Sequence, residues 1–316
     1  MNDTQASITA QMTAYSRWFH VQHDAPLIFE DRLAGQFLGE EGKQAVESLL
    51  LGSLERHNPA ARAAFADRSS AIAWLMQAGA SSAIVLARAR YAEECLEAAI
   101  AQGARQYVML GAGLDTFAFR RPDLLERITI FEVDHPASQE QKHRRIRELG
   151  WMCPANLHFT ALDFTRHNLP AALECSGFDG GAPTFFSWLG VSYYLAIGAV
   201  RATMDQIGAS APPGSELVFD YLDSAAFQPA KVAPRVARML ASVREIGEPM
   251  LSGFDADMLS GELADRGLEL REHLGPCDIQ RRYFMGRTDH HRACEHVHFA
   301  RAAIPTIRGQ NTGRAE

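Results

Sequence analysis

The feature that most constrains the fold is an alternation of short apolar runs with helical stretches, which begins at residue 106. Five runs rich in β-branched and aromatic residues are separated by segments whose apolar residues recur at three and four positions. Such an alternation predicts a parallel sheet with helices on both faces, and right-handed crossovers place the carboxyl ends of its strands at one edge. The predicted strands are Gln106–Gly111, Ile128–Asp134, Leu157–Asp163, Pro183–Leu189 and Glu216–Tyr221.

The segments around these strands complete a doubly wound α/β pattern. Helical periodicity predicts helices at Pro136–Leu149, Leu169–Cys175 and Ile197–Ile207. Two later runs, Leu268–Leu274 and His296–Ile304, alternate like strands and predict an antiparallel edge pair. The fold prediction is therefore a doubly wound, mostly parallel, Rossmann-like sheet with an antiparallel edge.

The chain before the sheet is predicted to be helical. From Thr4 to about Gln102 it is rich in alanine, with apolar residues at helical spacing and breaks at Asn58-Pro59 and Gly79. We predict a single domain over residues 1–316, with an N-terminal helical cap at 1–102, an α/β core at 103–304 and a disordered tail at 305–316.

Charge and cysteine content narrow the class of protein. The net charge of −7 disfavours a general nucleic-acid binder, and no apolar run has the length of a membrane span. Five scattered cysteines without a C-x-x-C pair predict neither a disulfide framework nor a zinc site. The N-terminus lacks the pattern of a signal peptide. We expect a cytoplasmic protein whose partner is a small molecule, with no nucleic acid and no membrane.

The strongest local signal is a glycine turn after the first predicted strand. The segment Val108-Met-Leu-Gly-Ala-Gly-Leu-Asp-Thr ends an apolar run with Gly111 and Gly113, which permit a tight turn and a close approach of a ligand to the backbone. The second strand ends at Asp134, 21 residues after Gly113 (134 − 113). An acid at this distance lies at the neighbouring strand tip, where it can accept both hydroxyls of a ribose. The two features together predict an adenosine cofactor.

The rest of the turn distinguishes between adenosine cofactors. A dinucleotide site needs a third glycine to bring a helix N-terminus to the pyrophosphate, and this chain has Thr116 there. The charge of Asp115 would also oppose a pyrophosphate. S-adenosyl-L-methionine has no phosphate and carries two cationic groups, so an acidic glycine turn suits it. We therefore predict this cofactor.

Two further positions are candidates for cofactor contacts. Asp163 and Phe164 end the third strand, where a carboxylate can accept from the adenine amine and an aromatic ring can cover the base; a surface aspartate that caps the next turn is the equal alternative. Arg88 and Arg90 precede the first strand, and either guanidinium can bind a methionine carboxylate. A solvated helix face paired with neighbouring glutamates is the alternative for both.

A family resemblance favours the cofactor interpretation. Ala87-Arg-Ala-Arg-Tyr, Leu-Gly-Ala-Gly-Leu-Asp-Thr and Phe-Glu-Val-Asp-His-Pro together resemble the leucine carboxyl methyltransferase-like family, above all its bacterial branch with tetracenomycin-type polyketide O-methyltransferases. The likeness runs from about Arg17 to Arg287. It implies a class I methyltransferase fold in which Arg88 holds the cofactor carboxylate and Gly111 lines the methionine part, with Asp134 at the ribose and Asp163 and Phe164 at the adenine.

The resemblance also implies a reaction. We expect S-adenosylmethionine-dependent O-methylation of a carboxylate or hydroxyl on a small, polyketide-like metabolite. One departure is Leu189, which stands where the family often has an acid after the fourth strand, so protein phosphatase, the substrate of the eukaryotic relatives, is not inferred for this chain. The alternatives are an NAD-dependent oxidoreductase and a catalytically silent nucleoside-binding relative.

No catalytic residue and no metal ligand is assigned. A carboxylate acceptor is already ionised and needs no general base, whereas a hydroxyl needs one. The histidines near the C-terminus have no clear carboxylate or cysteine complement, so the interpretation without a metal is preferred. These histidines are His290, His291, His296 and His298, and the pocket candidates by position are Tyr193, Tyr194, Asp220, Tyr221, Tyr283 and Arg287.

Overall fold

A seven-stranded mixed sheet organises the molecule. The computed structural model describes residues 7–166 and 168–305, and within these ranges the strands have the order β3-β2-β1-β4-β5-β7-β6. Neighbouring strands from β3 to β5 pair in parallel, whereas β7 is antiparallel to both β5 and β6. Because the strand order reverses between β1 and β4, a crevice is expected at their carboxyl ends.

The structure confirms the five predicted parallel strands and the antiparallel edge pair. At the carboxyl edge the chain leaves the ladder a little earlier than predicted, so Gly111, Asp163 and Leu189 lie in loops instead of strands. The strands are β1 (Gln106–Leu110), β2 (Thr129–Asp134), β3 (Leu157–Ala161), β4 (Thr184–Trp188), β5 (Glu216–Leu222), β6 (Glu269–Leu274) and β7 (Val297–Ala303).

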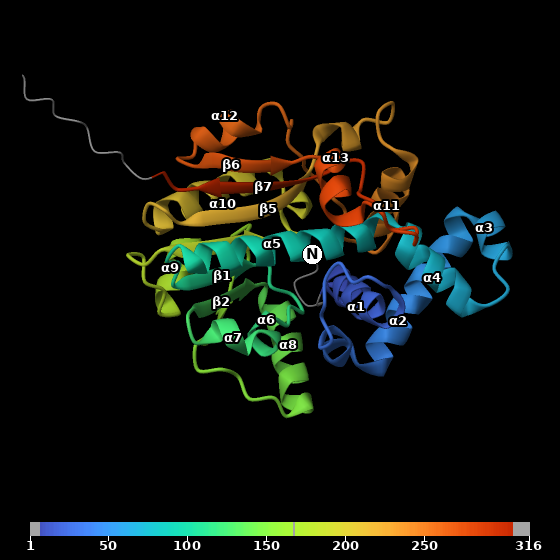
Figure 1. Cartoon of the computed structure of the whole chain (residues 1–316), viewed down its shortest axis with the longest axis horizontal. Helices are drawn as coiled ribbons and strands as arrows, with labels where there is room; N and C mark the ends of the chain where they lie inside the picture. The colour runs from blue at the N-terminus through green and yellow to red at the C-terminus, as the bar shows by residue number, and fades with distance from the viewer. Residues whose placement is uncertain (1–6, 167, 306–316) are drawn as a thin grey trace, which may run out of the picture.

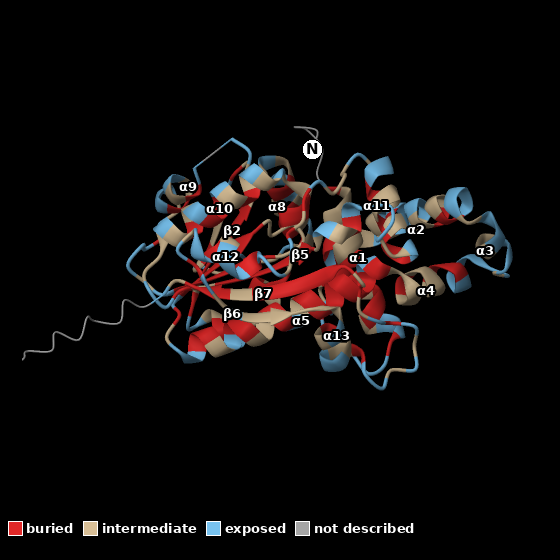
Figure 2. Ribbon diagram, turned by 90° about the horizontal axis from the view of Figure 1, so that it is seen from above, coloured by how far each residue is buried: buried red, intermediate tan, exposed pale blue. Residues whose placement is uncertain are grey.

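Helices cover both faces of the sheet because its strands are apolar on both faces. Every residue of β1 is buried; Tyr107 and Met109 pack in one hydrophobic cluster with α5 (Ala80–Ala101), and Val108 and Leu110 pack in another with α10 (Ile197–Ser210). Figure 2 shows the red strands between helices whose outer faces are pale blue. The other helices of these layers are α6 (Phe117–Arg120), α7 (Pro122–Leu125), α8 (Pro136–Leu149), α9 (Leu169–Cys175), α11 (Pro234–Glu245), α12 (Leu259–Ala264) and α13 (Pro276–Ile279), with short helical turns at Ser192–Tyr194, Ser224–Phe227 and Gln280–Phe284.

The predicted N-terminal helices are present and form a third cluster. The predicted breaks are confirmed, since Asn58 caps a helix through the N–H of Ala61 and Gly79 separates two helices bent by 55°. The helices are α1 (Ile8–His23), α2 (Ala34–His57), α3 (Pro59–Ala63) and α4 (Arg68–Ala78), which we call the helical cap. They gather at one end of the sheet (blue in Figure 1).

The sequence predicted that residues 1–102, which include helix α5, form the helical cap, but in the structure α5 packs on the sheet. Its buried side chains, among them Leu86, Tyr91 and Leu96, join the cluster that covers one face of the sheet. A stripe of alanines and leucines lets this helix lie flat on the strands, so residues 80–101 belong to the α/β layers. The predicted tail at 306–316 lies outside the described residues.

Among the described helices, none is by itself long and apolar enough to cross a membrane. Within the same residues, α4 and α5 reach that length and apolarity only as a pair, and the pair is bent by 55°.

Candidate active site

The glycine turn lies at the carboxyl edge of β1. Gly111 and Gly113 have φ angles of 78° and 52°, which favour glycine over residues with a side chain. A Cβ on Gly111 would also lie 2.2 Å from Cγ2 of Val191 in the loop after β4. The N–H groups of Gly111 and Ala112 donate to the carbonyl of Val133 in β2, at 2.7 and 3.2 Å. The turn is thus held against the neighbouring strand tip, as the sequence predicted.

Asp134, at the end of β2, faces this turn. Its Oδ2 accepts a hydrogen bond from the N–H of Gly113 at 2.5 Å, and its Oδ1 accepts from the N–H of His135 at 2.6 Å. Burial raises the pKa of the Asp134 carboxyl, although the two backbone donors act in the opposite direction. The carboxylate is therefore fixed beside the glycines by the backbone that it contacts.

Arg88 lies inside the molecule, in a cluster with Tyr193 and Asp220. Its Nη1 donates to the Tyr193 hydroxyl at 2.7 Å and to Oδ2 of Asp220 at 3.1 Å. Burial opposes the charge on Arg88, but Tyr193 and Asp220 outweigh it and raise the pKa of the guanidinium. Asp220 is fully buried in β5, and its Oδ1 accepts from the N–H of Gly190 at 2.6 Å.

The two arginines of the pattern before β1 thus have different environments. Arg90 is exposed and pairs with Glu94 at 2.6 Å. It therefore lies on a solvated helix face, which was the alternative to cofactor binding. Both hydrogen bonds of Arg88 come from Nη1, and among the described residues its Nη2 has no acceptor. This Nη2 lies 2.3 Å from the position of a Cβ on Gly190, whose φ angle is 72°, so a side chain there would displace the guanidinium and strain the backbone.

Asp163 and Phe164 follow β3 at the same edge. Oδ1 of Asp163 accepts from the N–H and the hydroxyl of Thr165, at 2.8 and 2.6 Å, so this aspartate does cap the next turn. Phe164 packs against Trp188 with ring centroids 6.3 Å apart. The alternative of a turn cap is thus present in the structure, and it leaves Oδ2 of Asp163 to pair with Arg166 at 3.4 Å.

One cavity brings all six predicted residues together. It has a volume of about 850 Å³, within the range of roughly 300–1,000 Å³ that is typical of ligand pockets. Part of it lies at the strand tips; the other part extends between the helical cap and α11. The cavity is lined by the predicted residues Arg88, Gly111, Gly113, Asp134, Asp163 and Phe164.

The comparisons with known proteins identify the family. The leucine carboxyl methyltransferase family model matches residues 10–208. The chain is 36% identical to YktD of Bacillus subtilis (strain 168) over 303 residues, which cover 96% of this chain and 99% of the relative. A Mycobacterium bovis (strain BCG / Pasteur 1173P2) relative is 31% identical over 245 residues, covering 77% and 75% of the two chains. Both relatives are named "Putative S-adenosyl-L-methionine-dependent methyltransferase".

The chain belongs to the leucine carboxyl methyltransferase family. Its fold resembles the crystal structure of a DUF574 family protein from Streptomyces avermitilis MA-4680, with a TM-score of 0.57, 16% identity, and coverage of 96% of this chain and 99% of that chain. The protein is an S-adenosylmethionine-dependent methyltransferase with a class I fold, as the sequence predicted. The alternative of an NAD-dependent oxidoreductase is therefore set aside.

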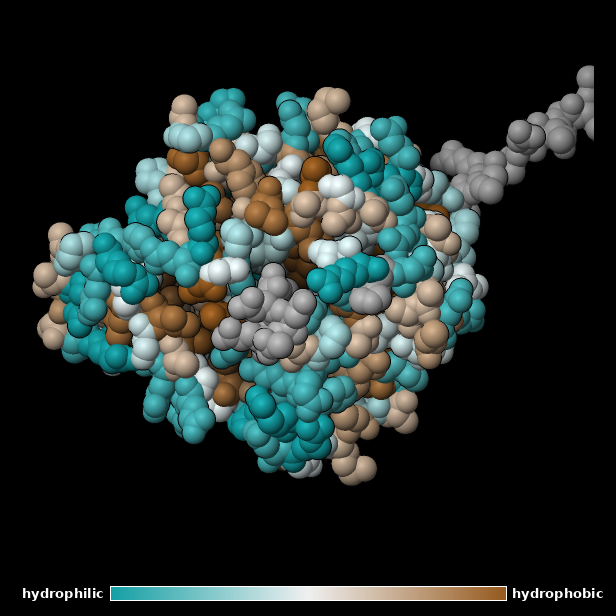
Figure 3. Space-filling view, turned by 180° about the vertical axis from the view of Figure 1, so that it is seen from behind, coloured by the Kyte–Doolittle hydropathy of each residue, from teal (hydrophilic) through white to brown (hydrophobic). Residues whose placement is uncertain are grey.

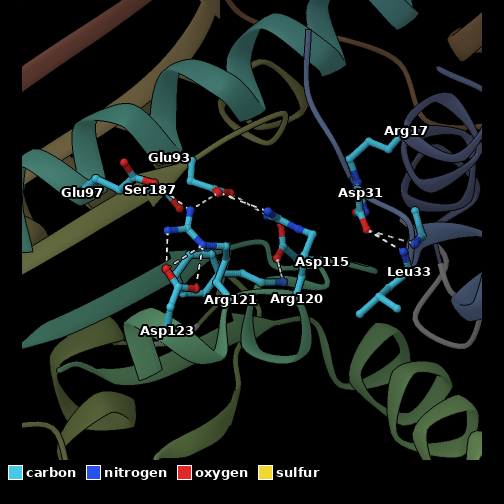
Figure 4. Close-up of polar contacts among 12 residues, drawn as sticks. Arg17, Asp31, Leu33, Glu93, Glu97, Asp115, Arg120, Arg121, Asp123 and Ser187 are labelled. Carbon is cyan, nitrogen blue, oxygen red and sulfur yellow. Dashed lines mark hydrogen bonds and ion pairs between the residues drawn. The ribbon is translucent and has the colours of Figure 1, made fainter. Parts of the chain in front are cut away.

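The sequence analysis missed a link between the cap and the glycine turn of this methyltransferase. Arg17 of α1 pairs with Asp31 at 2.8 Å, and its Nη2 donates to the carbonyl of Leu114 at 2.8 Å. Figure 4 shows Asp31 between Arg17 and Leu33. Both charged residues lie in the part of the chain that resembles the family. The sequence alone did not show which groups they contact.

Side chains in the loop after the glycines make contacts within the fold that the sequence did not indicate. Oδ1 of Asp115 accepts from the N–H of Phe117 at 2.7 Å, so this carboxylate binds the first residue of α6. At the far end of α6, Glu93 of α5 pairs with both Arg120 and Arg121 (Figure 4). These contacts fix the glycine turn from its C-terminal side.

A second missed contact holds the N-terminus of α1. The carboxylate of Glu248, in the segment after α11, accepts from the N–H groups of Ile8 and Thr9 at 2.8 and 3.1 Å and from the Thr9 hydroxyl at 2.5 Å. A carboxylate at a helix N-terminus also interacts favourably with the helix dipole. Because Ala10 lies against Gly113, this contact holds α1 over the glycine turn.

Three of the histidines singled out in the sequence form two groups, each beside an aspartate. His291 joins His20 on Oδ2 of Asp24, at 2.8 and 2.6 Å, and Nε2 of His20 also accepts from the N–H of Ile28. The three side chains connect α1 to the C-terminal segment, and no imidazole nitrogen of His20 remains for another ligand. His296 and His298 both lie within 3.5 Å of Asp223.

The residues that the sequence indicated as pocket candidates by position fall into two groups, those that line the cavity and those that do not. Tyr193 and Tyr194 line the cavity, as does Leu189, the departure from the family pattern. Asp220 acts on the cavity through Arg88. Among the described side chains of the wall, Tyr221, Tyr283 and Arg287 do not take part; their hydrogen bonds are to His273, to Glu94 and to Asp289.

Proposed function

We propose that this methyltransferase transfers a methyl group to a carboxylate or hydroxyl oxygen of a small, polyketide-like metabolite. The observation that carries the proposal is the extent of the cavity, which continues past the strand tips into a part lined by apolar side chains. A site for the cofactor alone would need only the strand tips. The family description, which names carboxyl methyl transfer, supports an oxygen acceptor.

The residues at the strand tips fit S-adenosyl-L-methionine. Asp134 would accept the ribose hydroxyls, and the side-chain-free turn of Gly111 and Gly113 would lie along the methionine part. Nη2 of Arg88, which lacks an acceptor among the described residues, would hold the carboxylate. Phe164 would cover the adenine, and Asp163 would accept from its amine.

When bound, the cofactor supplies a sulfonium-activated methyl group. What the chain adds is orientation and exclusion of water, and orientation alone can contribute roughly 7–11 kcal/mol. Tyr193 lies on the cavity wall with its hydroxyl held by Arg88. Burial raises the pKa of Tyr193, so this hydroxyl stays protonated; it donates to Oδ2 of Asp220 at 3.3 Å, and the tyrosine would therefore act as a fixed wall that positions the acceptor.

Radiolabelled cofactor tests the proposal directly. The protein is incubated with label and a small-molecule extract, and labelled products are treated with alkali, which cleaves methyl esters and leaves methyl ethers intact. We expect label in small molecules as ester or ether. Label on nitrogen or on protein would contradict the proposal. Cofactor binding without transfer to any fraction would instead identify a catalytically silent relative.

A further inference from the structure

The part of the cavity away from the strand tips has apolar walls from three elements. Figure 3 shows apolar side chains (brown) inside a hollow on the side where the helical cap lies. Leu49 and Leu251 line the cavity and are 36% and 57% exposed. We call this part the acceptor lobe; it is lined by Leu49, Leu50 and Leu54 of α2, Trp74 and Leu75 of α4, and Met239 and Val243 of α11, with Met250 and Leu251 after it.

The acceptor lobe is closed on one side by contacts between α2 and α11. The hydroxyls of Ser53 and Ser242 lie 3.0 Å apart. Glu245 pairs with both Arg56 and His57, at 3.2 and 2.6 Å. These polar groups at the rim are paired with each other.

One cation on the cavity wall is not paired. Seven arginines line the cavity, and six of them have a carboxylate oxygen within 4.0 Å. The seventh is Arg238, an exposed residue of α11 that precedes Met239. Within residues 7–166 and 168–305 no ion pair involves its guanidinium.

We infer that the acceptor is an amphipathic anion, with an apolar body in the acceptor lobe and an anionic group, away from the methylated oxygen, at Arg238. A guanidinium binds a carboxylate or phosphate in a planar, two-pronged geometry, and the neighbouring apolar walls favour a body without polar groups. This inference rests on the proposed function, because it assigns the acceptor lobe to the methyl acceptor.

Binding to the complex with S-adenosylhomocysteine tests this inference without methyl transfer. Decanoate, decyl phosphate and decanamide are titrated calorimetrically into that complex. We expect either anion to bind about fivefold more tightly than the amide, a modest factor because Arg238 is exposed. Affinity should rise roughly two- to fourfold for each methylene between hexanoate and decanoate. Equal binding of decanoate and decanamide would overturn the inference.

Arg238→Met should lower the affinity of the anions to that of decanamide and leave the affinities of decanamide and S-adenosylhomocysteine unchanged. The matched control is Arg244→Met, an exposed arginine of the same helix that does not line the cavity. An unchanged decanoate affinity in Arg238→Met would place the anion elsewhere and refute the role of this residue. If the anions bind as expected but no oxygen is methylated, the proposed function fails and the anion site stands.

Discussion

The two parts of the cavity have walls of opposite polarity. At the strand tips the wall consists of backbone and charged groups, and Asp134, Arg88 and Asp220 are each held by at least one partner. In the acceptor lobe the wall consists of apolar side chains from separate helices, and at its edge lies Arg238, for which the described part of the chain provides no ion pair. A fixed polar region suits a polar cofactor, whereas an apolar lobe suits the apolar body of an acceptor.

The largest expected effect concerns the buried pair beneath the strand tips. Asp220→Ala leaves the Arg88 guanidinium buried without its carboxylate, which should lower the free energy of unfolding by about 3–5 kcal/mol. Urea denaturation measures it. The control, on the helix that carries Arg88, is Arg90→Ala, which breaks an exposed pair and should cost at most about 1 kcal/mol. Similar losses in the two variants would show that the cluster is not a buried charge pair.

The second prediction concerns cofactor affinity. Asp134→Asn removes the charge that would accept the ribose hydroxyls and should weaken S-adenosylhomocysteine binding roughly 10- to 100-fold. Asp163→Asn serves as the comparison and should have a smaller effect, because Asp163 already caps the turn at Thr165. Titration calorimetry of both variants ranks the two carboxylates. An unchanged affinity in Asp134→Asn would remove the ribose assignment.

The third prediction concerns the connection of the cap to the glycine turn. Glu248→Gln retains one acceptor oxygen of two and loses the charge at the N-terminus of α1, so we expect a destabilisation of about 1–2 kcal/mol. Amide exchange in the first turn of α1 should accelerate while exchange in α5 stays unchanged. Glu245→Gln, whose partners Arg56 and His57 lie on the rim, is the control. Unchanged exchange at Ile8–Ala10 would refute the role of Glu248.

The smallest expected effect is a pH dependence. Burial alone would raise the pKa of Asp24, but hydrogen bonds from His20, His291 and Gln77 outweigh it and lower that pKa. A lowered carboxyl pKa contributes stability above the unfolded value near 4, and this contribution is lost as the pH falls. Asp24→Asn should therefore reduce the acid-induced loss of stability by about 1 kcal/mol between pH 5 and pH 3. Identical pH profiles of the wild type and the variant would contradict this.

The strand tips were predictable from the sequence because their determinants are local. A glycine turn directly follows β1, and the distance from Gly113 to Asp134 is set by one helical crossover. Strand periodicity likewise predicted the antiparallel pair of β6 and β7. Backbone geometry converts such spacings into positions without knowledge of the rest of the fold.

The contacts that sequence analysis missed join segments far apart in the chain. Glu248 meets Thr9 across 239 residues, and Asp220 meets Arg88 across 132. No spacing encodes such a pair, and each residue alone has the pattern of an ordinary surface charge. The acceptor lobe was missed for the same reason, since α11 lies far along the chain from α2 and α4.

The central claim is that the strand tips of this methyltransferase form a nucleoside site beside an apolar lobe. Calorimetric titration of the wild-type protein with S-adenosylhomocysteine tests it most directly. We expect saturable binding of one molecule per chain in the micromolar range. Absence of any heat of binding at hundreds of micromolar ligand would contradict it.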